Sequence, residues 1–408
     1  MVMKNILSDL LCPHPNPLPR GEGIEIIVEK SLKDKSAELL RLVWFDGKES
    51  LIVCDNATYQ ALAARIAKEI AAKVLVLDSP KADIKIVEQI RGHKYDALIG
   101  VGSGTISDLC KYAAFLDDKD YAVFPTAASM NGYVSANASI SVAGYKQTLP
   151  AKLPKGVFCD LQVLADAPLR LTLSGLGDSL CRPTAQADWL LSHLLLDSKY
   201  NAAVFAMSEQ YEKELFEYST KLSGRDLQVI ELLIKTLLAS GLAMTIAGGS
   251  YPASQGEHMI AHTMEMQHNL QGTYHGEEIG VTTLIMANIQ ENMLKNRLKL
   301  PLPVNCDEKI EAYFKPSLHA QVKAGFAPKK QILEEKYQII NERLISEDSV
   351  IRDAISQFIL PEKYLRKVLQ NAQAPSEAAQ IGWNQGDLQA ATLHAKYIRN
   401  RFTCLDFL

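Results

Sequence analysis

Residues 95–116 read YDALIGVGSGTISDLCKYAAFL, with an apolar run, a glycine-rich turn and a second apolar segment in direct succession. The first run is short and uninterrupted, as in a buried strand, whereas the segment after the glycines has apolar residues at helical spacing. A strand that passes over glycines into a helix begins a βαβ unit, and such units build parallel sheets covered by helices. This stretch therefore predicts an α/β fold.

The segments around this stretch repeat the pattern. Between residues 49 and 129, strand-like runs at 50–56, 73–78 and 121–129 alternate with helix-periodic segments at 57–72 and 82–93. After residue 164 the pattern changes to long helix-periodic segments, at 173–196, 203–222 and 226–248. We therefore predict an α/β domain over residues 49–164 and an all-α domain over residues 165–408, preceded by an N-terminal segment, 1–48.

The N-terminal segment contains the run CPHPNPLPRGEG at residues 12–23, in which prolines alternate with other residues. Such a run forms neither a helix nor a central strand. It resembles the peptides that bacterial interspersed repeats add when they are inserted into genes. We predict an inert, extended insertion, and the alternative is a binding role for His14 or Arg20.

The composition argues against several classes of function. The net charge is −4 and the isoelectric point is about 6.2, which argues against a general binder of nucleic acid or anionic membranes. The seven cysteines are scattered without a CxxC pair, as in a reduced cytoplasmic protein. No apolar run reaches the ~18 residues of a membrane helix, and the N-terminus does not have the pattern of a signal peptide. We expect a cytoplasmic protein.

The turn GVGSGTISD, residues 100–108, is a candidate site for a nucleotide phosphate. Glycines between a strand and a helix let backbone amides approach a phosphate at the positive end of the helix. The turn is neither a Walker loop nor the GxGxxG fingerprint, so a tight turn without a ligand is the alternative.

Polar side chains also follow other predicted strands. Thr126, Ser129 and Ser135 come just after the strand at 121–129, at the carboxyl edge where ligands bind parallel sheets. Ordinary turn and cap hydrogen bonds are the alternative for each hydroxyl. Asp55 ends an earlier strand and could hold a ribose hydroxyl or cap the next helix.

Four of the nine histidines, His258, His262, His268 and His275, lie within residues 256–280. His258 and His262 are four residues apart and share a helix face, but Met259 replaces the glutamate of the zinc-protease pattern. Two histidines with a distant carboxylate would form a three-ligand metal site with open positions, as in catalytic centres. Spacing does not identify the carboxylate, and a hydrogen-bonded surface or core role is the alternative for each histidine.

Six blocks of the sequence together resemble the glycerol-1-phosphate dehydrogenases, within the superfamily of metal-dependent alcohol dehydrogenases, glycerol dehydrogenases and dehydroquinate synthases. The blocks are GVGSGTISD, PTAASMNGYVS, LSGLGDSL with TAQADW, GGSYPASQGEHMIAH, YHGEEIGV and RNRFTCLDF. They follow the family's order from about residue 49 to the C-terminus. The resemblance implies a dehydroquinate synthase-like fold, with a Rossmann-like domain, a helical domain, and a nicotinamide and a metal between them.

The resemblance also implies roles for individual residues. The metal ligands would be Asp178, His258 and His275, and the ion would be zinc or nickel. The NAD or NADP contacts would be Asp55, Gly102, Ser103, Gly104, Thr105, Asp108, Thr126, Ser129 and Ser135. The ion would polarise the carbonyl of dihydroxyacetone phosphate, and hydride transfer would yield sn-glycerol 1-phosphate. We expect a homo-oligomer that acts on a small phosphorylated polyol.

Two positions near the substrate depart from the family pattern. Asn131 replaces the usual aspartate, and Cys181-Arg182-Pro183 replaces Gly-Lys-Tyr. The alternatives are therefore a dehydrogenase of another polyol, such as glycerol, and a homologue that binds nucleotide without turnover; dehydroquinate synthase chemistry ranks lower. Arg182 follows Asp178 by four residues on a predicted helix, so it is the candidate contact to a substrate phosphate, with a solvated arginine as the alternative.

Overall fold

The computed structural model describes residues 23–408 except 143, 144, 269 and 271. The predicted proline-rich insertion therefore lies outside the described residues, apart from Gly23. The chain forms two compact units. Of the described residues, the first contains those up to Gly175 together with Lys221–Thr245, and the second contains those of Leu176–Thr220 and Ile246–Leu408. The boundary predicted after residue 164 marks the change in sequence pattern, whereas the compact units divide after Gly175, within a helix.

The first unit is built on a six-stranded sheet with the order β1-β8-β5-β4-β2-β3, in which all neighbours pair in parallel. The strands are β1 (Glu25–Glu29), β2 (Ser50–Asp55), β3 (Lys73–Leu77), β4 (Ala97–Gly102), β5 (Asp120–Pro125) and β8 (Gly156–Asp160). Between β5 and β8 the chain forms an antiparallel hairpin of β6 (Asn137–Val142) and β7 (Tyr145–Pro150).

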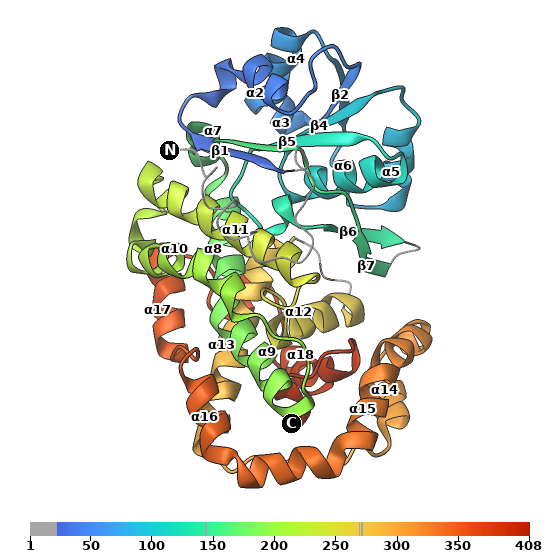
Figure 1. The fold of residues 1–408 in the computed structure, drawn as a ribbon, viewed down its shortest axis with the longest axis vertical. Coiled ribbons are helices and arrows are strands. Elements are labelled where there is room, and N and C mark those ends of the chain that lie inside the picture. Colours follow the sequence, from blue (N-terminus) through green and yellow to red (C-terminus); the bar gives the residue numbers. More distant parts are fainter. Residues whose placement is uncertain (1–22, 143–144, 269, 271) are drawn as a thin grey trace. The chain divides into compact units, whose positions relative to one another are not determined.

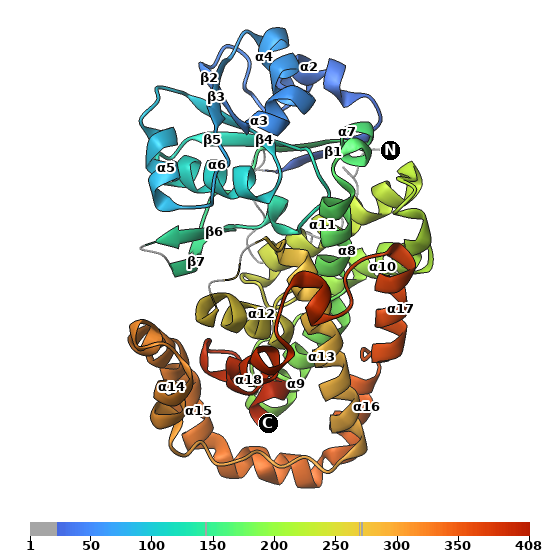
Figure 2. The same ribbon diagram turned by 180° about the vertical axis from the view of Figure 1, so that it is seen from behind.

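Helices cover both faces of this sheet (Figures 1 and 2). One layer contains α2 (Ser36–Leu42), α3 (Asn56–Thr58) and α4 (Ala64–Ile70), and the other contains α5 (Ile84–Arg91) and α6 (Gly104–Leu116). Side chains on both faces of the central strands are therefore covered by helices. Four residues of β4 and β5 have no exposed surface: Leu98, Ile99, Ala122 and Val123. The predicted α/β fold is confirmed. The short helix α7 (Leu161–Asp166) follows β8.

Helix α11 (Leu227–Ala247) belongs to the first unit through Thr245. Among the described residues it is the one helix long and apolar enough to cross a membrane, with a mean hydropathy of 1.8 in its most apolar window. Because 67% of that window is buried inside the fold, packing in the core accounts for its composition.

The described residues of the second unit form helices joined by loops, without a β-strand. Its helices are the end of α8 (Leu169–Ser179), α9 (Arg182–Leu196), α10 (Ala206–Glu217), α12 (Gly256–Gln267), α13 (His275–Lys295), α14 (Cys306–Tyr313), α15 (His319–Ser346), α16 (Asp348–Ser356), α17 (Glu362–Ala372) and α18 (Gln385–His394). Its core contains Leu191 of α9, Ile260 of α12 and Ile279 of α13, each with no exposed surface. This agrees with the all-α domain predicted for the C-terminal part.

Candidate metal centre and nucleotide-binding turn

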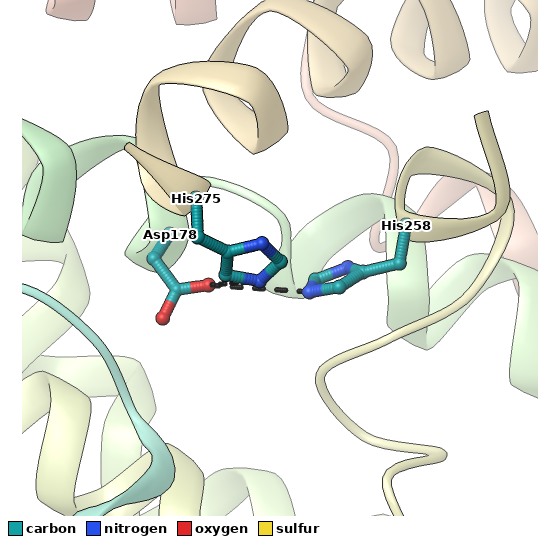
Figure 3. A group of neighbouring side chains, drawn as sticks. All are labelled: Asp178, His258 and His275. Carbon is teal, nitrogen blue, oxygen red and sulfur yellow. Dashed lines mark ion pairs between the residues drawn. The ribbon is translucent and has the colours of Figure 1, made fainter. Parts of the chain in front are cut away.

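Asp178, His258 and His275 converge within the second unit (Figure 3). Nε2 of His258 and Nε2 of His275 each lie 4.0 Å from Oδ1 of Asp178. One donor atom from each residue lies within 4.8 Å of the other two. Asp178 and His258 are buried, and the side chain of His275 is one-third exposed, so the group can be reached from one side.

The packing of two helices explains why Asp178 and His275 meet. Gly177 precedes Asp178 on α8, and Gly276 follows His275 at the start of α13. A Cβ atom on Gly177 would lie only 2.0 Å from the carbonyl oxygen of Gly276, so the two helices can approach this closely only because Gly177 has no side chain. This close approach places Asp178 beside His275.

A buried carboxylate, Glu257, orients His258. Nδ1 of His258 lies 3.0 Å from Oε1 of Glu257, which also accepts a hydrogen bond from the amide of Gln255 at 2.7 Å. Glu257 has no exposed surface, and burial raises the pKa of its carboxyl, but hydrogen bonds from His258 and from the backbone amide of Gln255 oppose this, and the pKa lies below the ordinary value. An ionised Glu257 keeps the proton of His258 on Nδ1, so Nε2 has a lone pair to offer toward Asp178.

The donor set fits a divalent transition metal. One carboxylate oxygen and two imidazole nitrogens are hard and borderline ligands that suit such ions, and three protein ligands leave positions open for substrate. A second group, Cys181 with Glu257 and His258, also lies within 4.8 Å. Burial, with the charges of Glu257 and Asp178, raises the pKa of the Cys181 thiol. Its Sγ lies 3.2 Å from the carbonyl oxygen of Asp178 and 3.4 Å from that of Ala253, so the thiol has backbone acceptors of its own.

The two remaining histidines of the cluster lie apart from this donor set. The ring of His262 is 6.0 Å from that of His258 and 5.9 Å from that of His275, and its Nδ1 lies 2.8 Å from Oε2 of Glu265. Nδ1 of His268 lies 3.6 Å from Oδ2 of Asp387. The family resemblance implies that His262 and His268 support the site or lie beside it rather than bind the metal, and this stays a prediction.

Asp188, a fully buried carboxylate on α9, is not among the functional residues predicted from the sequence. Its Oδ1 accepts hydrogen bonds from the amide of Cys404 at 3.0 Å and from Nε2 of Gln290 at 3.1 Å. Its Oδ2 accepts one from the amide of Gly256 at 3.2 Å. Asp188 therefore ties the start of α12, two residues before His258, to α13 and to the C-terminal segment.

Asp188 is expected to make stability depend on pH. Burial raises its pKa from 3.8 to about 7, although its hydrogen bonds from Cys404 and Gln290 oppose this. Between these values the folded state holds a proton that the unfolded state has lost, so the contribution of Asp188 falls as pH rises toward 7. We expect the stability advantage of the wild type over Asp188→Asn, measured by urea unfolding, to shrink from pH 5 to pH 8. An advantage that is constant or grows with pH would contradict this.

The glycine turn joins β4 to α6 as predicted. Ser103 stands just before α6, and Gly104 and Thr105 begin it. A Cβ atom on Gly102 would lie 2.6 Å from Cγ1 of Ile106, so glycine is needed for the helix to pack on the strand. The amide of Thr126 donates to the carbonyl of Gly102 at 3.1 Å, which brings the two predicted nucleotide-binding blocks together.

A buried lysine, also missed, organises this edge of the sheet. Nζ of Lys111 donates to the carbonyls of Gly132 at 2.6 Å and Asn137 at 2.9 Å, and it lies 3.3 Å from Oδ1 of Asp108. Oγ of Ser135 accepts from the same ammonium at 3.4 Å. Lysine at the i+3 position from Asp108, in an otherwise apolar helix, is the sequence signal that could have identified it.

The other predicted residues of the first unit have structural partners as well. Thr126 and Ser129 are buried. Asp55 caps α3, because its Oδ1 accepts from the amide of Thr58 at 2.8 Å. Nδ2 of Asn131 donates to Oγ of Ser240 at 3.3 Å.

Arg182, the predicted phosphate contact, is not solvated. Its guanidinium forms an ion pair with the buried carboxylate of Glu212, with NH2 donating to Oε1 at 2.6 Å, and NH1 donates to Oε1 of Gln186 at 2.5 Å. These partners occupy most of its donors. Arg182 is therefore the weaker candidate for a phosphate.

Comparisons with known proteins agree with this architecture. Residues 27–168 match the family model described as iron-containing alcohol dehydrogenase. The glycerol-1-phosphate dehydrogenase [NAD(P)+] of Thermococcus sibiricus is 32% identical over 280 residues, covering 67% of this chain and 78% of that protein. The protein of the same name from Halalkalibacterium halodurans is 34% identical over 207 residues, covering 50% of this chain and 52% of its own length. Maleylacetate reductase from Agrobacterium tumefaciens shares the fold, with a TM-score of 0.59 and 17% identity over 91% of this chain and 89% of that one.

Proposed function

Because this chain belongs to the glycerol-1-phosphate dehydrogenase family, we propose that it interconverts dihydroxyacetone phosphate and sn-glycerol 1-phosphate with NAD or NADP. The family makes it an NAD(P)-dependent dehydrogenase, and its relatives support a polyol as the substrate class. We further propose a homo-oligomer in the cytoplasm, from family membership and composition.

The observation that carries this proposal is the convergence of Asp178, His258 and His275 on one point. When bound, a divalent ion would polarise the substrate carbonyl and stabilise negative charge on its oxygen, and the nicotinamide would supply the hydride. The three side chains would hold that ion, for which we propose zinc or nickel. Glu257 keeps Nε2 of His258 directed toward the other ligands.

The first unit would hold the dinucleotide. Gly102 to Thr105 place backbone amides at the start of α6, where the helix end favours the pyrophosphate, and Thr126, Ser129 and Ser135 would add contacts from the neighbouring segment. Asp108 would position the turn together with Lys111. Asp55 uses Oδ1 to cap α3, so its Oδ2 would be the acceptor for a ribose hydroxyl.

A dehydrogenase of an unphosphorylated polyol, such as glycerol, is the second candidate. The pairing of Arg182 with Glu212 favours it, because this arginine then offers little to a phosphate. A homologue that binds nucleotide without turnover is the third candidate, and Asn131 favours it, because an amide cannot transfer a proton as a carboxylate does.

The test is a comparison of dihydroxyacetone phosphate with dihydroxyacetone, measured by nicotinamide oxidation on metal-loaded protein. Charge-assisted hydrogen bonds of roughly 1.5–3 kcal/mol to the phosphate should give dihydroxyacetone phosphate a kcat/KM that is at least about tenfold higher. Asp178→Ala is the matched control and should remove activity on both ketones. Higher kcat/KM for dihydroxyacetone would favour the second candidate, and nucleotide binding without turnover of either ketone would favour the third.

A further inference from the structure

Two arginines near the C-terminus, Arg399 and Arg401, reach the loop that precedes α12. NH1 of Arg399 donates to Oγ of Ser254 at 3.1 Å, and NH2 of Arg401 donates to Oγ of Ser250 at 2.8 Å. Arg401 also donates to the carbonyl of Ser254. Ser254 lies four residues before His258, so both guanidinium groups lie close to the start of the helix that carries a metal ligand.

Neither guanidinium forms a direct ion pair with a carboxylate in the part of the chain that the structure describes. Other arginines of this unit do: Arg182 pairs with Glu212 and Arg343 pairs with Asp197. Both Arg399 and Arg401 are partly buried. Burial lowers the pKa of both, and the charge of Arg399 lowers that of Arg401 further. Two adjacent cations without a direct counterion are costly inside a protein unless an anion binds there.

Acidic groups near the pair act only at longer range. Burial is the largest influence on the pKa of Arg399, and the charges of Glu265 and Glu257 raise it. Both carboxylates already accept hydrogen bonds from histidines, Glu257 from His258 and Glu265 from His262. Because Glu257 contacts His258, Arg399 is within range of charges at the candidate metal centre but forms no direct ion pair with these carboxylates.

The position of the arginines is fixed by its surroundings. The carbonyl of Arg401 accepts from Nζ of Lys329 at 2.9 Å, and Lys329 is paired with Asp406 at 2.8 Å. The guanidinium of Arg401 lies 4.6 Å from the centre of the Tyr251 ring. Asp188 joins the amides of Cys404 and Gly256, and so connects the C-terminal segment to the start of α12. The pair is therefore a preorganised feature.

We infer that Arg399 and Arg401, with the hydroxyl of Ser254, bind the phosphate group of a phosphate monoester substrate. Arg401 is largely occupied by the loop, so it contributes charge and positions the loop. Arg399 has one hydrogen bond within the described residues, which leaves most of its five N–H donors for phosphate oxygens. The inference rests on the proposed function, because only a short bridge separates phosphate from carbonyl in dihydroxyacetone phosphate.

The experiment compares Arg399→Gln, Arg399→Lys and Arg182→Gln, with Arg343→Gln as the control arginine. Binding of inorganic phosphate and of sn-glycerol 1-phosphate to metal-loaded protein is measured by calorimetry, and kcat/KM is measured for both ketones. Loss of charge-assisted hydrogen bonds should weaken phosphate binding in Arg399→Gln by about 10- to 100-fold. Arg399→Lys should recover part of this affinity, and in Arg399→Gln kcat/KM should fall more for dihydroxyacetone phosphate than for dihydroxyacetone.

Unchanged phosphate binding in Arg399→Gln would overturn the inference, as would a loss found only in Arg182→Gln. If Arg399→Gln does not fold, as judged by circular dichroism and metal content, Arg399→Lys and Ser254→Ala are compared instead, and full affinity in both overturns it. A different result would contradict the proposed function while leaving the phosphate site intact. Wild-type protein that binds phosphate through Arg399 but does not oxidise sn-glycerol 1-phosphate would retain the anion site and exclude that reaction.

Discussion

His258→Ala is expected to release the metal and abolish turnover, and Asp178→Ala and His275→Ala should do the same. Two remaining ligands cannot hold a catalytic ion in a site that keeps positions open for substrate. Glu257→Gln changes only the carboxylate that supports His258, so we expect it to lower metal affinity by ~10–100-fold. The loss of metal affinity in the three ligand variants should be larger than this. Metal content of purified protein and nicotinamide oxidation are measured together.

His262→Ala is the matched control, because His262 lies on the same helix face as His258 and its ring is 6.0 Å away. It should retain most of the metal. Equal metal loss in His258→Ala and His262→Ala would show that the ligands within this cluster are wrongly assigned.

Asn131→Asp is expected to raise kcat for dihydroxyacetone phosphate several-fold, with little change in cofactor affinity. An asparagine can orient a substrate but cannot exchange a proton, and general acid–base help contributes roughly 10²–10⁴-fold in enzymes. The substitution fits the local structure, because Ser240 can reverse its hydroxyl and donate to a carboxylate where it now accepts from Nδ2. The measurement is kcat, KM and cofactor affinity for wild type and variant on both ketones.

The opposite outcome of this substitution is also informative. If Asn131 reflects a changed substrate, Asn131→Asp should lower activity on that substrate. A variant with unchanged kcat and unchanged preference between ketones would show that Asn131 does not take part in the reaction.

The alternation of strands and helices could be predicted from the sequence because hydrophobic periodicity is a local property. The order of the sheet could not, because pairing depends on contacts distant in sequence. Strand β1 illustrates this, because EIIVE pairs with β8, more than a hundred residues later. The alternation of strand-like and helix-periodic segments in the sequence begins only at residue 49. The hairpin of β6 and β7 pairs residues close in sequence, and it too is absent from the elements predicted from the sequence.

The candidate site shows the same limit. Spacing placed His258 and His262 on one face, but it could not choose Asp178 and His275, and only the family resemblance named them. The supporting carboxylates are harder still, since the role of Asp188 depends on Cys404 at the other end of the chain. The isolation of Arg399 and Arg401 from carboxylates is likewise a property of the folded protein.

The close contact between Gly177 and Gly276 has a consequence for how the protein acquires its ion. The spacing of Asp178 and His275 is set by backbone packing, so we expect the polypeptide itself to hold these two candidate ligands together. An ion that enters such a site has little chain entropy to remove, which favours affinity without a folding step. Gly177→Ala would disturb this arrangement even though glycine cannot be a side-chain ligand. A residue without a side chain would then help to set the geometry of the proposed metal site, and a search for ligand residues alone would not find it.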